Sequence, residues 1–518
     1  MTRFDNPVLT KEMRTRMRGT RAYWLLFFYV MLCSLFLFVA YLSWHNRYAS
    51  GGFTLTPGTT AAGRQLFQML FVAQAAMISL IVPALTAGML TIEREQRTFE
   101  LLLLTVLPPR QIIGGKVGSA FGFAALLLTA SLPLAGICFL LGGISPLEIA
   151  IVYLLLAMSA LTYAAIGIFF SALLRSTAVA TATTYMAALF LAAATGAAGG
   201  GGRAVLFSAV SPIAAVFNAL HAAPFFRWHV PTWIAALLLN AAIAALAAAG
   251  AVHRLEEGVS ERPTLLRWLT LVLFALLALG ITGNVFGSGT TSASQVRAAL
   301  AWLSGALLIA LAALSVIFCT GDAPEVRGAG RASGGARKGL SRLLEVRPFA
   351  GGYATGPAYI ALLFLFGAAI LASGIVLAPA TTRAMSPETL GAALLVALAG
   401  VAFCVALSRL YSVLTGSRYT AAAVLFVTVT ALLLFPLFSY VGWDSSLNPA
   451  HRLIWETLYL NPVIAFLAVA LNPGDWAKTV PALWAGQEGA WVVTVFLYLA
   501  AAVVLEGVGR AILARSRK

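Results

Sequence analysis

Charged residues are scarce in this chain. Of its 518 residues, 10% are charged and 60% are hydrophobic, whereas a soluble domain has about a quarter of its residues charged. A chain of this length could otherwise form about three soluble domains, but it lacks the polar side chains needed to cover their surfaces. The composition therefore excludes an ordinary soluble protein and predicts that much of the surface faces lipid.

Cysteine and histidine are also few, and neither type clusters. The four cysteines lie inside apolar runs without paired spacing, which argues against a disulfide framework or a zinc site. The nearest pair among the five histidines, His221 and His229, exceeds the i, i+4 spacing of a helical metal site. The acidic residues and histidines of the loops show no recognisable pairing. We therefore predict no metal site and no catalytic residues.

A phosphate-binding loop is missing as well. Gly115-Lys116 is followed by Val117 and lacks the leading glycine of such a loop. Any ATP that drives this protein must therefore be bound by another subunit. Ionisable residues within apolar runs, which usually mark ion-coupled transport, are rare. Glu506 lies one turn before Arg510, so we expect a local ion pair, and Arg409 at a span end is expected to extend its charge to the interface.

Long apolar runs are what the sequence has in abundance. A membrane-spanning helix needs about 20 mostly apolar residues. A continuous apolar run is expected to form a helix, because a helix satisfies all of its own backbone hydrogen bonds within lipid. Three amides within these runs, Gln68, Gln74 and Asn240, either line a path or hold helices together, with helix contact as the expected role. Twelve stretches reach this length: 23–44, 67–92, 117–142, 149–173, 177–199, 232–252, 268–287, 298–319, 358–380, 390–411, 419–441 and 489–509.

The basic residues predict the orientation of these spans. If the spans alternate, the side that holds both termini carries 26 of the 34 Lys and Arg residues, and the opposite side carries 8. Basic loops stay on the cytoplasmic side, so both termini are predicted to be cytoplasmic. The net charge of +16 thus comes from the ends of apolar stretches rather than from one basic patch, and nucleic-acid binding is not expected.

The twelve spans divide into two sets of six. Residues 1–254 and 255–518 have the same span order, so we predict an all-α integral membrane protein with two six-helix halves, the second a degenerate repeat. The halves differ between their second and third spans. The first has a charged segment there, whereas the second has a stretch rich in Gly, Ala and Arg, 320–357, that is typical of a flexible cytoplasmic linker.

The charged segment of the first half reads as a short helix near 93–107. On a helix, Glu93, Arg97 and Glu100 share one face, and Glu93 and Arg97 have the favourable order for an i, i+4 ion pair. Pro108-Pro109 ends the helix. From the residues alone, this segment is either a rigid charged element at the membrane surface or a solvated loop between two spans.

The same segment resembles the cytoplasmic stretch of ABC-2 type permeases. The N-terminal Asn6-Pro7-Val8-Leu9 and the basic residues that follow are similar to the opening motif of that family. Two departures stand out, because Arg97 replaces the usual glycine and Val106 replaces the usual proline. The residues that match the family stretch are Glu93, Arg94, Glu95, Thr98, Glu100, Leu102, Leu103, Thr105, Leu107, Pro109, Ile112, Gly115 and Lys116.

The resemblance implies the permease subunit of an ABC exporter in the cytoplasmic membrane of a bacterium. ATP and Mg²⁺ would be held by a separate ATPase subunit, and a second permease chain is a possible further partner. The opening helix would lie against the bilayer as an interfacial helix through Lys11, Arg14, Arg18 and Arg21. An ion-coupled carrier and a membrane enzyme acting on a lipid-linked substrate remain alternatives. The residues that the resemblance assigns to ATPase coupling are Glu93, Arg94, Glu95, Arg97, Thr98 and Glu100.

Overall fold

The computed structural model describes most of the first half of the chain and parts of the second. The described residues are 6–18, 20–49, 59–99, 104, 107–174, 176–199, 222–225, 228–256, 264–287, 311, 314, 319, 355–377, 387–416, 421, 424, 425, 428 and 490–515. The chain divides into two compact units, Met1–Gly280 and Ile281–Lys518, which we describe separately. The first unit extends past residue 254, and the division into repeated halves stays a prediction.

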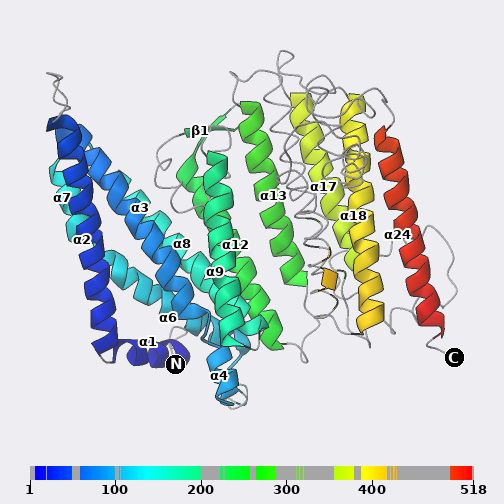
Figure 1. The fold of residues 1–518 in the computed structure, drawn as a ribbon, viewed down its shortest axis with the longest axis horizontal. Coiled ribbons are helices and arrows are strands. Elements are labelled where there is room, and N and C mark those ends of the chain that lie inside the picture. Colours follow the sequence, from blue (N-terminus) through cyan, green and yellow to red (C-terminus); the bar gives the residue numbers. More distant parts are fainter. Residues whose placement is uncertain are drawn as a thin grey trace, which may run out of the picture. The chain divides into compact units, whose positions relative to one another are not determined.

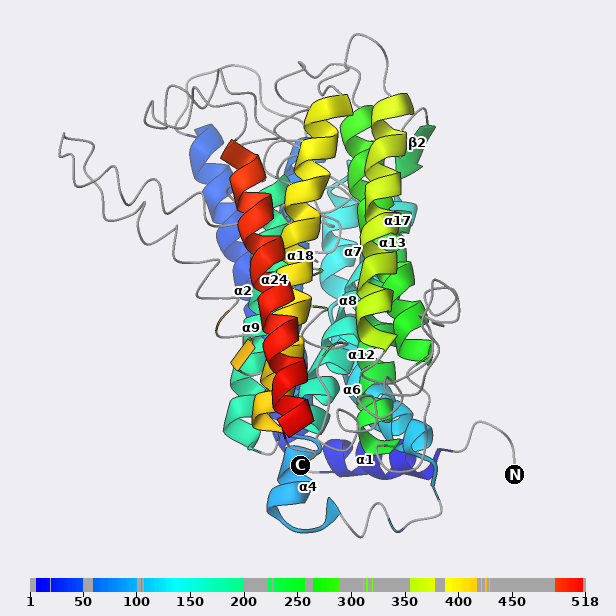
Figure 2. The same cartoon turned by 90° about the vertical axis from the view of Figure 1, so that its right-hand side faces the viewer.

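The first unit is a bundle of long helices with two short elements at one end (Figure 1). Helix α1 lies across that end of the bundle, and α4 projects beyond it; a second view shows the same arrangement (Figure 2). The helices are α1 (Pro7–Met17), α2 (Thr20–Ala49), α3 (Thr59–Thr86), α4 (Thr91–Glu95), α6 (Pro109–Ala130), α7 (Leu132–Leu140), α8 (Pro146–Leu173), α9 (Thr177–Gly199) and α12 (Thr232–Glu256).

The predicted span 117–142 is interrupted in the structure. Helix α6 ends at Ala130, and α7 begins at Leu132 after a turn at Ser131. Pro133 explains the break, since proline has no N–H to donate and its ring collides with the carbonyl one turn earlier. The Ser131 hydroxyl donates to the Leu128 carbonyl at 2.7 Å and so occupies an acceptor at the end of α6.

Helix α8 lies at the centre of the first unit. Ser145 and Glu148 form a capping box that fixes its first turn, and the helix packs against α3, α6, α9 and α12. Two glycines permit these close approaches. A Cβ on Gly167 would collide with the Thr86 hydroxyl of α3, and one on Gly250 of α12 would lie 2.7 Å from the Phe169 ring.

A small hairpin precedes α12. Strand β1 (Ala222–Phe225) pairs antiparallel with β2 (Trp228–Pro231), with Ala222 opposite Pro231 and Phe225 opposite Trp228. Helix α12 starts directly after β2, at Thr232, which is buried. The hairpin therefore leads directly into α12.

The second unit is described through three long helices, α17 (Gly356–Leu377), α18 (Pro387–Thr415) and α24 (Ala490–Arg515), while α13 (Thr264–Gly287) crosses the boundary between the units. Phe403 of α18 meets Tyr498 of α24 edge to face, with ring centroids 5.2 Å apart. Arg510 and Glu506 form the predicted i, i+4 pair at 3.3 Å, and Arg409 also bonds Glu506, at 2.8 Å. Arg409 is therefore held within the helix pair as well as lying near a span end.

Seven helices among the described residues are long and apolar enough to cross a membrane. They confirm an all-α membrane protein with several spans. The twelve-span count stays a prediction, because the stretches 298–319 and 419–441 and the linker 320–357 fall largely outside the described residues.

Candidate functional site

The site is built around α4, and the end of α8 fixes where α4 begins. The Ser171 hydroxyl of α8 accepts hydrogen bonds from the backbone N–H groups of Leu90, at 2.8 Å, and Thr91, at 3.2 Å. These donors have no partner within their own helix, since the first N–H groups of any helix lack one. A buried side chain from a helix about 80 positions later in sequence thus caps α4.

Helix α4 is shorter than the sequence predicts. It ends at Glu95, and Arg97 adopts a left-handed backbone with φ of 58°. The Arg97 N–H donates to the Arg94 carbonyl at 3.1 Å, and the Thr98 N–H donates to the Glu93 carbonyl at 2.9 Å. This is the Schellman pattern, whose left-handed position favours glycine. It gives a physical reason why the resembling family has glycine where this chain has Arg97.

The predicted ion pair between Glu93 and Arg97 is wrong. Arg97 lies beyond the helix, and Glu93 instead directs its carboxylate toward Lys116 of α6, with Oε1 2.7 Å from Nζ. Glu100 falls outside the described residues, so the structure does not test its place on the predicted charged face. The side chain of Arg97 is exposed, which leaves it as a charge at the tip of the turn.

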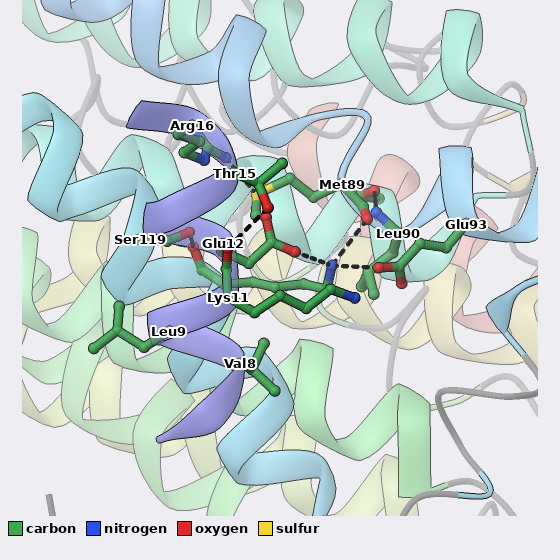
Figure 3. A network of polar contacts seen from close by, with 12 residues as sticks. Val8, Leu9, Lys11, Glu12, Thr15, Arg16, Met89, Leu90, Glu93 and Ser119 are labelled. Atoms are coloured by element: carbon green, nitrogen blue, oxygen red, sulfur yellow. Dashed lines mark hydrogen bonds and ion pairs between the residues drawn. The ribbon is translucent and has the colours of Figure 1, made fainter. Parts of the chain in front are cut away.

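Lys116 joins three segments at one buried point. Its ammonium donates to Glu12 of α1 at 3.1 Å, to Glu93 of α4 at 2.7 Å and to the Met89 carbonyl at 3.2 Å. Figure 3 shows Glu12 and Glu93 reaching from their two helices toward the same position. The Lys116 side chain is 2% exposed, and each carboxylate is 22% exposed. A buried cation with charged partners on both sides holds α1, α4 and α6 together.

Arg94 and Glu95 attach α4 to the junction between α8 and α9. The Arg94 guanidinium donates to the carbonyls of Ala172 and Leu174, both at 2.8 Å, and stacks on Phe99. A cation suits these acceptors because the carbonyls at a helix C-terminus lack partners and carry partial negative charge. Glu95 accepts the N–H of Thr177, the first residue of α9, at 2.8 Å. Arg94 therefore binds the partial negative charge at the C-terminal end of α8, and Glu95 binds the partial positive charge at the N-terminal end of α9.

Helix α1 packs closely on α6. Asn6 caps α1 through the N–H of Val8 and donates to the Gln111 carbonyl of α6 at 2.7 Å. Gly115 permits this approach, since a Cβ there would lie 2.8 Å from the Val8 side chain. Arg16 points inward and donates to the Leu85 carbonyl at 3.2 Å. Burial lowers the pKa of Arg16, and nearby Glu12 partly opposes that shift.

Comparison with known families decides the assignment. Residues 43–252 match the family described as ABC-2 family transporter protein. This segment is an ABC-2 transporter domain. No curated protein matches the chain. The ABC-2 domain begins near the end of α2 and includes α4, α6, α8 and most of α12. The protein is therefore a multi-pass membrane protein that carries an ABC-2 transporter segment.

The ABC-2 domain brings most of the predicted coupling residues to one place. Glu93, Arg94 and Glu95 all bond helices outside their own segment, whereas Thr98 closes the turn by donating to the Glu93 carbonyl. Their assignment to ATPase coupling stays a prediction. The sequence reasoning missed Lys116 as a partner, although a lysine at the start of an apolar run was a usable signal, since ionisable groups within spans are costly unless paired.

The predicted interfacial residues separate into two groups. Lys11, Arg14 and Arg18 are exposed along α1, opposite the face that meets α6. Arg21 belongs to the next helix, α2, which begins at Thr20. The chain changes direction between these helices, because the C-cap residue Arg18 has an extended backbone. The basic face of α1 is therefore one turn shorter than a continuous helix would give.

Proposed function

We propose that this chain is the permease subunit of an ATP-driven exporter and that a separate ATPase subunit docks on the exposed tip of α4. The observation that carries the proposal is the set of bonds from this one short helix to the ends of others. Through Ser171, Arg94, Glu95 and Glu93, α4 is bonded to α8, α9 and α6. Lys116 extends these bonds to α1.

The tip of α4 offers a surface that takes no part in these bonds. Ile92, Gln96 and Arg97 are exposed there, while Arg94 and Glu93 face the bundle. A docked subunit that moves the tip would displace several helix ends at once, because ion pairs and hydrogen bonds to helix termini resist separation. Such an element suits the transfer of motion from a soluble motor to membrane-spanning helices.

The end of the first unit that carries α1 and α4 is proposed to face the cytoplasm. The 26-to-8 distribution of basic residues supports a cytoplasmic location for both termini, and the proposed membrane is the cytoplasmic membrane of a bacterium. The exposed Lys11, Arg14 and Arg18 of α1 suit contact with anionic headgroups at that surface. ATP and Mg²⁺ would be bound by the partner ATPase, and a second permease chain is a further possible partner.

Charge reversal at the tip tests the docking proposal. Arg97→Glu leaves the bonds of Arg94, Glu95 and Lys116 in place and should lower the affinity for the ATPase at least about tenfold, since reversing a charge at an interface sets like charges against each other. Affinity is measured by titrating purified ATPase onto the chain in nanodiscs. The isolated chain should hydrolyse no ATP.

Arg64→Glu is the matched control. Arg64 is also an exposed arginine, near the start of α3 and separated from α4 by about 30 Å of helix at 1.5 Å per residue. Its reversal disrupts only the surface pair with Glu148 and should leave ATPase affinity unchanged. Equal affinity in the Arg97→Glu variant and the unmodified chain would reject docking at the tip of α4.

A further inference from the structure

One polar side chain in the interior of the first unit, Gln74, lacks a close hydrogen bond among the described residues. Gln74 of α3 is completely buried, and neither atom of its amide forms a hydrogen bond with any described residue. It lies within the membrane-spanning stretch Gly63–Glu95. Burying an amide without hydrogen bonds costs several kcal/mol in such surroundings, so a residue kept there needs a role other than packing.

Contact between helices, the expected role for such an amide, does not account for Gln74. Asn240 of α12 shows the contrast. Its amide donates to the Ala236 carbonyl at 2.9 Å, and its backbone carbonyl accepts from Thr162 of α8 at 3.1 Å. Asn240 therefore does bond within and between helices. Gln74, equally deep in the bundle, forms no close hydrogen bond with its own helix or with a described neighbour, and the Tyr153 hydroxyl of α8 is its nearest polar contact.

Other polar groups gather around Gln74 from three more segments. The Tyr153 hydroxyl of α8 lies near the Gln74 amide and shares a hydrogen bond with Ser131 at 3.1 Å. The Tyr29 hydroxyl of α2 is buried beside Ser131 and Cys33 and forms no close hydrogen bond with a described residue. Cys33, one turn after Tyr29, contacts the Met77 sulfur of α3 at 3.9 Å. Polar atoms from α2, α3, α8 and the α6–α7 turn thus converge inside an apolar core.

The chemistry of this cluster points to an uncharged ligand. Gln74 supplies two N–H donors and a carbonyl acceptor, and the tyrosine and serine hydroxyls each donate and accept. None of the cluster residues Gln74, Tyr29, Tyr153, Ser131 and Cys33 is a Lys, Arg, Asp or Glu, so no charged side chain of the cluster would balance a charged ligand. Leu70, Phe71 and Ile78 lie within about one turn of Gln74 on α3 and are fully buried, and the Phe71 ring meets the Tyr153 ring with centroids 5.1 Å apart.

We infer that Gln74, Tyr29, Tyr153 and Ser131 form an internal site that hydrogen-bonds an uncharged group able both to donate and to accept, supplied by water or by a hydroxyl or amide of the transported molecule. The inference goes beyond the proposed function, because it concerns the interior of the bundle and holds whether or not an ATPase docks on α4. It also distinguishes Gln74 from a residue whose only role is to join helices.

The first test separates a binding role from a structural one. Gln74→Leu removes every hydrogen-bonding atom at nearly constant volume, and Tyr29→Phe removes a single hydroxyl. If the site serves a ligand, both variants fold, and in the absence of the transported molecule they unfold at the same temperature as the unmodified chain, or higher, because each lacks a buried polar group that has no close protein partner. A lower unfolding temperature in both variants would mean that these groups hold the helices together, and the inference would fail.

The second test detects the ligand itself in the full chain in nanodiscs. Hydroxyl-radical footprinting oxidises side chains that contact water, and the cluster contains a reactive reporter in Tyr29. Its oxidation should exceed that of Tyr359, an equally buried tyrosine of the second unit. In the Gln74→Leu variant it should fall about fivefold, as expected for losing one hydrogen bond.

Native mass spectrometry on the same samples distinguishes the two sources. Oxidation without an added mass identifies water, and an added mass that disappears in Gln74→Leu identifies a co-purified molecule; either result supports the site. Oxidation no higher than at Tyr359, with no mass that depends on Gln74, would overturn the inference. Neither measurement involves the ATPase, so this failure is distinguishable from failure of the docking proposal.

Discussion

Lys116→Met gives the most direct test of how the helix ends are joined. The substitution keeps a long unbranched side chain but removes the ammonium that bonds Glu12, Glu93 and the Met89 carbonyl. Breaking a fully buried ion pair by deleting one partner costs about 3–5 kcal/mol, because the remaining charge is left without a partner. Each carboxylate is 22% exposed, so water offsets part of this, and we expect a loss of about 2–3 kcal/mol.

The loss should be measurable at α1, one of the two helices that Lys116 joins to α6. This helix is held by its packing on α6 and by the Glu12 ion pair, so without Lys116 it should separate from the bundle more often. A cost of 2–3 kcal/mol corresponds to a roughly 30- to 150-fold increase in opening. Hydrogen exchange of the α1 amides, followed by mass spectrometry in nanodiscs, measures this directly. Amides in the middle of α8 should exchange at their original rate and serve as the internal control.

A second variant separates charge from packing. Combining Lys116→Met with Glu12→Gln and Glu93→Gln removes the unpaired carboxylates, so at least half of the lost protection should return. Unchanged α1 exchange in Lys116→Met would refute the reasoning, since the ammonium would then contribute nothing to holding α1. A triple variant as unprotected as the single one would show that the methionine side chain, rather than unpaired charge, causes the effect.

Two further predictions concern single side chains. Arg97→Gly should stabilise the turn after α4 by about 0.5–1 kcal/mol, because glycine adopts the left-handed φ of 58° freely. The gain should appear as slower hydrogen exchange of the Thr98 amide. Arg97→Ala keeps the backbone strain and should give no such gain. In the second unit, Glu506→Gln should lower the free energy of unfolding by about 1–2 kcal/mol, because it breaks the partly buried pair with Arg409. Arg510→Gln should change the free energy of unfolding, measured by thermal unfolding, by less than about 0.5 kcal/mol, because the Arg510 side chain is 77% exposed.

Much of the architecture could be predicted from the sequence because it depends on properties that act locally. Apolar runs of spanning length gave the long helices, and the pair between Glu506 and Arg510 followed from their spacing on one helix. The N-terminal motif marked α1, and the resemblance located α4. Pro133 carried a signal for the break between α6 and α7 that hydropathy alone did not reveal, because a proline barely changes the average over a run.

The sequence pointed to the charged segment around Glu93 but did not predict which residues its side chains bond. Helical spacing placed Glu93 beside Arg97, yet the left-handed backbone at Arg97 ends the helix before that pair can form. Spacing rules apply only while the helix continues. The unpartnered amide of Gln74 was equally invisible, since a polar residue in a span reads the same whether or not it finds a neighbour.

The sequence by itself determined that this protein lies in a membrane as a set of helices and carries an ABC-2 segment near its N-terminal end. The tertiary structure alone decided which charges meet. Lys116 bonds Glu93, 23 positions away, and Glu12, 104 positions away, and these contacts exist only because Gly115 lets α1 approach α6 closely. The reason is physical: an ion pair forms where two charges come within a few ångströms, and packing, rather than order along the chain, sets that distance.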